Sequence, residues 1–205
     1  IRFRMEESRH RFQEGRINQP KTLVHLEAAD LHLDHFYLSR KLRNFCDALG
    51  YQSFLSVDSG IEAPDALFER IEREGFLEAP AIKVYYLTAK MLMHPEEEHY
   101  FFALKEYLQE AAIHFSLEEQ NALYIFLKNY CINEKINKGQ SAYFQQLFDI
   151  SKAALEKEMQ LNGGWITPQS YKNLITVGLY IKAFAWVEQF ILDYTVKLPE
   201  ENREN

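Results

Sequence analysis

Apolar residues recur at steps of three and four along nearly the whole chain. Such steps place side chains on one face of an α-helix, whereas a half-buried strand alternates at every second residue. No sustained period-two run flanked by turn residues occurs, and the chain has only eight Gly and six Pro. The sequence therefore predicts an all-α protein. Representative stripes are Leu38, Leu42 and Cys46; Ile82, Tyr85 and Ala89; Phe101, Leu104 and Leu108.

Helix-end signals divide this pattern into about eight or nine helices with short connections. Ser116 followed by Glu119 is a capping box, and Thr167-Pro168 is typical of a helix start. Pro95, followed by three glutamates, is expected in the first turn of another helix. Short loops make successive helices antiparallel neighbours. We expect no sheet, and we expect turns near residues 56–63, 76–79, 94–95, 114–116, 138–140 and 162–167.

Size and charge narrow the class of protein. With 205 residues, of which 47% are hydrophobic, the chain can bury a substantial core. Its formal net charge is −7, which makes a nucleic-acid partner unlikely because phosphate contacts need a basic face. The most apolar stretch, 176–192, is interrupted by Lys182 and Glu188, so no membrane segment is predicted. A cytoplasmic location follows by default.

The domain organisation is expected to be simple. We predict one helical-repeat domain over 1–205, with the charged residues 1–20 as a short or frayed helix. The chain begins at Ile1, and Pro199-Glu200-Glu201 has the composition of another first turn. Both features favour a fragment of a longer chain.

The segment 167–199 resembles one degenerate tetratricopeptide repeat of about 34 residues. An aromatic residue, Tyr171, precedes Leu174 by three, apolar residues line the next helix, and Pro199 ends it. Ile175 and Val187 replace the glycine and the small residue usual in that family. The start of the segment, 167–175, also resembles the first helix of a pentatricopeptide repeat. The resemblance implies antiparallel helix pairs stacked as an α-solenoid-like array.

Three functions follow from this pattern. The favoured one is a non-enzymatic scaffold that binds a protein or peptide on a concave face, without a cofactor. The alternative is single-stranded RNA binding in the pentatricopeptide style, with one base per repeat. The third is a helical metal-dependent enzyme.

Two histidine patterns in the sequence are candidate metal sites. The run Asp30-Leu31-His32-Leu33-Asp34-His35 resembles the HxHxDH motif of metallo-β-lactamase-like hydrolases. Its flanks are helical, so it is interpreted as a helix start with Asp30 or Asp34 as the N-cap. His94 and His99 are five residues apart, which would place them on different faces of a helix, and Pro95 follows the first. We therefore predict no metal site.

Amide and cationic side chains provide a candidate partner-binding face. They could hold a peptide backbone or a terminal carboxylate, although for any single residue a solvated surface, or an Asn side chain bridging adjacent helices, is the simpler interpretation. Lys128 and Lys135 flank the three asparagines spaced by four. The candidate residues are Arg40, Arg43, Asn44, Asn129, Asn133, Asn137, Lys172 and Asn173.

The last helix, expected over 184–198, carries apolar residues on more than one stripe. A terminal pair in a repeat array exposes the surface meant for its neighbour. We therefore expect Trp186, Phe190 and Tyr194 to contribute to an open apolar patch, through which the chain could associate.

The stripes also predict buried positions. We expect Leu127→Ala to lower the free energy of unfolding by about 2–5 kcal/mol, the usual range for a large-to-small core change. Urea unfolding followed by circular dichroism measures this loss. A loss below about 1 kcal/mol would place Leu127 on the surface. The residues expected in the core are Leu123, Phe126, Leu127, Tyr171, Leu174, Phe190 and Ile191.

Overall fold

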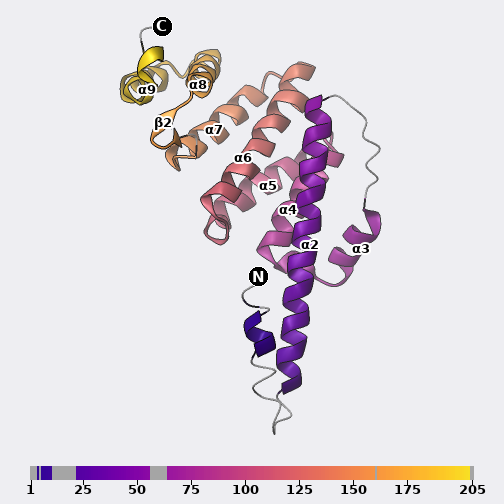
Figure 1. The fold of residues 1–205 in the computed structure, drawn as a ribbon. Coiled ribbons are helices and arrows are strands. Elements are labelled where there is room, and N and C mark those ends of the chain that lie inside the picture. The colour runs from indigo at the N-terminus through magenta and orange to yellow at the C-terminus, as the bar shows by residue number, and fades with distance from the viewer. Residues whose placement is uncertain (1–3, 5, 11–21, 56–63, 160, 204–205) are drawn as a thin grey trace. The chain divides into compact units, whose positions relative to one another are not determined.

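A computed structural model of the protein describes residues 4, 6–10, 22–55, 64–159 and 161–203 (Figure 1). Nearly all of these residues are helical, which confirms the all-α class. The chain divides into two compact units, Ile1–His114 and Phe115–Asn205. Within the described residues, no helix has both the length and the apolar character needed to cross a membrane. In the charged segment 1–20, residues 4 and 6–10 are described and are helical.

In the first unit, α4 packs against both α2 and α5 (Figure 1). The stripes predicted for these helices are buried, because each faces a neighbouring helix. The expected turn at 56–63 lies outside the described residues, and the expected turn at 76–79 contains a 3-10 helix. The elements are α2 (Thr22–Leu55), α3 (Asp65–Arg73), a 3-10 helix (Phe76–Glu78), α4 (Pro80–Met93), α5 (Glu98–Glu110) and a 3-10 helix (Ala112–His114).

The interpretation of Asp30 or Asp34 as an N-cap is wrong. Helix α2 begins at Thr22 and runs straight through both residues. Asp30 is exposed, and the Asp34 carboxylate accepts a hydrogen bond from the Arg70 guanidinium of α3 over 2.9 Å. Solvent and Arg70 satisfy these carboxylates, so neither has to cap a helix.

The predicted place of Pro95 in the first turn of a helix is also wrong. Helix α5 begins at Glu98, with Glu97 as its N-cap, and Pro95 lies in the turn before it. The backbone N–H of Glu97 donates to the carbonyl of His94 over 2.9 Å. This hydrogen bond closes a tight turn between α4 and α5.

In the second unit, successive helices α6 to α9 each pack against the next. Both predicted caps are confirmed: the Ser116 hydroxyl accepts from the Glu119 N–H, and Thr167 accepts from the Ser170 N–H, each over 3.2 Å. The elements are α6 (Leu117–Asn129), a π-helix (Tyr130–Lys135), 3-10 helices (Ile136–Lys138, Thr195–Lys197 and Glu200–Asn202), α7 (Tyr143–Glu156), β1 (Leu161–Asn162), β2 (Trp165–Ile166), α8 (Pro168–Tyr180) and α9 (Phe184–Tyr194).

A small hairpin forms where only a turn was expected. Strand β1 pairs antiparallel with β2, with Leu161 opposite Ile166. Gly163 and Gly164 have φ of 60° and 89°, a region that glycine adopts without strain, so the chain can reverse within two residues. The expectation of no sheet is therefore wrong at this one ladder.

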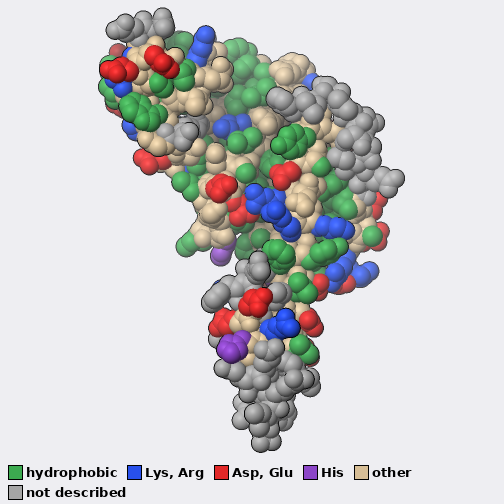
Figure 2. All heavy atoms as spheres, viewed as in Figure 1, with side chains coloured by type: hydrophobic (Ala, Val, Ile, Leu, Met, Phe, Trp, Pro, Cys, Tyr) green, Lys and Arg blue, Asp and Glu red, His purple; other side chains and the backbone are tan. Residues whose placement is uncertain are grey.

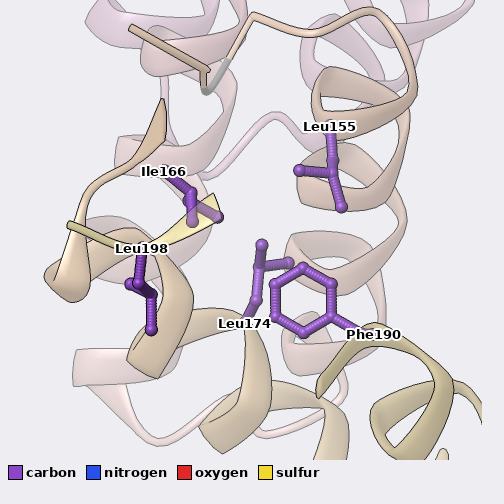
Figure 3. Close-up of a cluster of buried hydrophobic side chains, with 5 residues drawn as sticks. All are labelled: Leu155, Ile166, Leu174, Phe190 and Leu198. Atoms are coloured by element: carbon purple, nitrogen blue, oxygen red, sulfur yellow. The ribbon is translucent and has the colours of Figure 1, made fainter. Parts of the chain in front are cut away.

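The hairpin places Ile166 in the core of the second unit. Side chains from α7, β2, α8, α9 and the segment after α9 point toward one another there (Figure 3). This cluster joins the C-terminal segment to the helices. Its buried members are Leu155, Ile166, Leu174, Phe190 and Leu198.

The predicted core is confirmed in part. Four of its residues are buried: Leu123, Leu127, Leu174 and Phe190. Phe126 and Tyr171 are half-buried, and Ile191 is 38% exposed, so its predicted burial is wrong. Ile191 directly follows the buried Phe190, and adjacent residues of a helix point in different directions.

The apolar exposure on α9 involves other residues than expected. Phe190 is buried, and the rings of Trp186 and Tyr194 stack on it with centroids 5.0 and 4.8 Å away. Trp186 and Tyr194 are half-buried. The large apolar side chains most exposed at this end are Phe184, Leu192 and Val196.

Helices α8 and α9 approach closely at Gly178. A Cβ atom added there would lie 2.5 Å from Cγ2 of Val187 and 3.3 Å from Cε2 of Phe148. Glycine in a helix costs about 0.5–1 kcal/mol relative to alanine. Close packing between the two helices explains its presence here.

We expect Gly178→Ala to destabilise the protein despite the better helix propensity of alanine. Overpacking a core costs about 1–3 kcal/mol, which exceeds the propensity gain. Urea unfolding of the variant measures the loss. The double variant G178A/V187A removes the clashing methyl group, so it should lose less stability than the sum of its two single variants. Additive losses would contradict this explanation.

Candidate functional site

A groove of about 250 Å³ in the second unit combines apolar and polar side chains. Its walls come from α6 and the π-helix on one side and from α8 on the other, with α7 between them. Apolar side chains line part of it, and a cation, hydroxyl groups and an amide line the rest. Its lining residues include Lys128, Ile132, Leu147, Ser151, Ser170 and Asn173.

Lys128 is the unusual member of this groove. Burial lowers the pKa of its ammonium group below the ordinary value of 10.5. Within the part of the chain that the structure describes, Lys128 makes no ion pair. A partly buried cation without a counter-charge is costly, so an anion that enters the groove would be stabilised by it.

The polar groups opposite Lys128 are held in place by helix α8. The Ser170 hydroxyl hydrogen-bonds the Thr167 hydroxyl over 2.9 Å, and the same threonine caps the helix. The side-chain amide of Gln169 donates to the side-chain oxygen Oδ1 of Asn173 over 2.8 Å. This bond turns the amide of Asn173 so that its NH₂ group remains available as a donor, at a residue that lines the groove.

Of the residues proposed from sequence in the second unit, only Asn173 lines the groove. Lys172 is exposed beside it on α8. Asn129 ends α6, Asn133 lies in the π-helix and Asn137 in the following 3-10 helix. The three asparagines therefore do not form a ladder of α-helical turns, since each belongs to a different kind of turn.

The remaining proposed residues lie on α2, in the first unit. Arg40 and Asn44 are exposed. Arg43 is half-buried, and its guanidinium lies 6.0 Å from the centre of the Tyr85 ring. The residues of the predicted face thus belong to both units.

The histidines of the Asp30–His35 run line a cavity of about 510 Å³ in the first unit, together with Glu78 and His114. The His35 ring meets Phe76 edge-on at 5.6 Å. Burial lowers the pKa of His35, as does the neighbouring His32, whereas Asp34 acts in the opposite direction. Among the described residues, these side chains do not converge closely enough to share a metal ion.

The charges on the surface are mixed. On the face drawn in Figure 2, Lys and Arg side chains lie among Asp and Glu side chains. Such a distribution differs from the continuous basic face on which nucleic-acid affinity depends. This face therefore provides no specific support for RNA binding.

No protein-family model matches the chain, and searches of curated proteins and of solved structures find no match either.

The lowered pKa of Lys128 predicts a pH-dependent stability difference. The folded state holds this proton less tightly than the unfolded state, so folding is penalised at pH values where the lysine is charged. We expect Lys128→Met to be more stable than the wild type at pH 7. The gap should shrink as the pH rises toward 10.5, because the wild type then loses the buried charge.

Thermal unfolding of both proteins across this pH range measures the gap. Lys172→Met, which removes an exposed charge from the same unit, is the control. An equal or greater stability of the wild type at pH 7 would contradict the assigned burial.

Proposed function

We propose that the second unit is a non-enzymatic binding module that accepts an extended peptide segment in the groove between α6, α7 and α8. The observation that carries this proposal is Lys128, a partly buried cation at the wall of a mixed groove that makes no ion pair with any residue the structure describes. The peptide would present a carboxylate, from a side chain or from its C-terminus, to this ammonium group.

The composition of the groove supports a peptide over a compact polar ligand. Leu147 and Ile132 offer apolar contact for a side chain, while Asn173 and Ser170 offer groups that hydrogen-bond a backbone. A few polar groups set on an apolar surface can fix the orientation of a chain.

The arrangement of helices is a second support. Each of the helices α6 to α9 packs on the next, which is the order of contacts expected for stacked helix pairs. In such an array, the helices of one layer form the concave face on which a peptide lies. Under this proposal α6 and α8 form that layer, and the resemblance of 167–199 to a tetratricopeptide repeat agrees with it.

The test is a selection of random displayed peptides on the full chain, followed by fluorescence polarisation with the selected peptides. We expect acidic residues or a free C-terminus to be enriched. Lys128→Met should weaken binding by roughly ten- to a hundredfold, because a hydrogen bond to a charged group contributes about 1.5–3 kcal/mol.

Lys152→Met is the matched control. Lys152 neighbours Ser151 on α7, but it pairs with Glu156 at 3.9 Å and does not line the groove. Its loss should leave the affinity unchanged. Selected peptides that bind wild type and K128M equally, or that bind only outside the second unit, would overturn the proposal.

A further inference from the structure

The turn between α4 and α5 brings imidazole and carboxylate groups together. His94 is the C-cap of α4 and Glu97 is the N-cap of α5. One ligand atom from each of His94, Glu96 and Glu97 lies within 4.8 Å of the others. The spacing of the two histidines excluded a zinc site on a continuous helix. A turn separates α4 from α5 here, so the spacing of the two histidines does not exclude a zinc site.

His99 lies beside Glu97 and outside the set of three converging side chains, so it would have to turn toward them to become a fourth ligand. Its Nδ1 lies 3.8 Å from Oε2 of Glu97, and Nδ1 of His94 lies 3.8 Å from Oε1 of Glu96. Both separations exceed the length of a hydrogen bond. Two ligands bound tetrahedrally to one zinc ion at about 2.0–2.1 Å are roughly 3.3 Å apart. Small rotations of exposed side chains would close the difference.

We propose that His94, Glu96 and Glu97, with His99 as a fourth ligand, bind a divalent transition-metal ion, and that Zn²⁺ fits the site best. Two nitrogens and two carboxylate oxygens are donors that zinc accepts in a tetrahedral shell. Calcium and magnesium prefer oxygen ligands alone, so two imidazoles disfavour them. A cation would also offset the repulsion among the three consecutive glutamates Glu96–Glu98.

The Tyr100 ring lies beside both imidazoles. The centroid of the His99 ring lies 3.9 Å from that of Tyr100, and the His94 ring lies 6.4 Å from the same ring. Pro95 fixes one backbone dihedral of the turn between the ligands. A turn restricted in this way loses less conformational entropy when a metal orders it.

The site is open to solvent, since the side chains of His94 and Glu97 are 38% and 46% exposed. An ion can therefore enter without unfolding the turn. Once bound, it would join the end of α4 to the start of α5, two helices that pack against each other in the first unit. The proposed peptide groove lies in the other unit, so the failure of one proposal would not affect the other.

The experiment is a zinc titration of the full chain, freed of metal by a chelator and carrying no polyhistidine tag, in competition with a chromophoric chelator. We expect one Zn²⁺ per chain. His94→Ala and Glu97→Gln should each weaken binding by about tenfold or more, since even the loss of an outer-shell partner costs that much. His99→Ala should weaken it as well.

The double variant E110Q/H114A is the control, because it removes an exposed glutamate and an exposed histidine from the same unit. It should bind zinc as the wild type does. Zinc should also raise the melting temperature of the wild type and of the control, but not that of H94A. Circular dichroism verifies that each variant is folded. Equal affinity of wild type and H94A, or the absence of a saturable site, would overturn the proposal.

Discussion

The burial of one apolar stripe per helix against other helices is the constraint on which both units depend. Helix α4 buries Ile82, Tyr85 and Ala89, and it packs against both α2 and α5. In the second unit, each helix from α6 to α9 covers the next. In the second unit the packed helices are neighbours in the chain, whereas in the first unit α4 also packs on α2, from which α3 separates it. The candidate polar sites lie where packed helices meet or where one helix ends and the next begins.

The features that the sequence predicted correctly were those that depend on a few consecutive residues. Ser116 and Thr167 cap helices as predicted, since a cap depends on the three residues that follow it. The π-helix at Tyr130–Lys135 and the hairpin at Leu161–Ile166 were missed. Both involve packing between different elements: Lys135 lies over the ring of Tyr143 on α7, and the hairpin places Ile166 in a core shared with α9.

In the candidate sites, too, some features were visible in the sequence and others depend on packing between helices. Asn173 was proposed from the sequence as part of a partner-binding face, but Lys128 was considered only as a flank of the asparagines. Its signal in the sequence was weak, one lysine beside the stripe residue Leu127. Its importance depends on Leu147 and Ser151, which another helix contributes. The His94–His99 turn was set aside because the spacing of its histidines does not suit one helical face, whereas the start of α5 at Glu98 places His94, Glu96 and Glu97 in a turn.

Two lysines on the same helical run show how a buried charge can be assigned to structure or to binding. Lys135 is almost fully buried, and its ammonium lies 5.4 Å and 5.3 Å from the ring centres of Tyr130 and Tyr143. Aromatic faces stabilise a desolvated cation, so the protein itself compensates this charge. Lys128 is less buried, yet its pKa is lowered by burial and it makes no ion pair among the described residues. Compensation for Lys128 must come from solvent or from a ligand, which is why binding an anion would stabilise the charge of Lys128 and not that of Lys135.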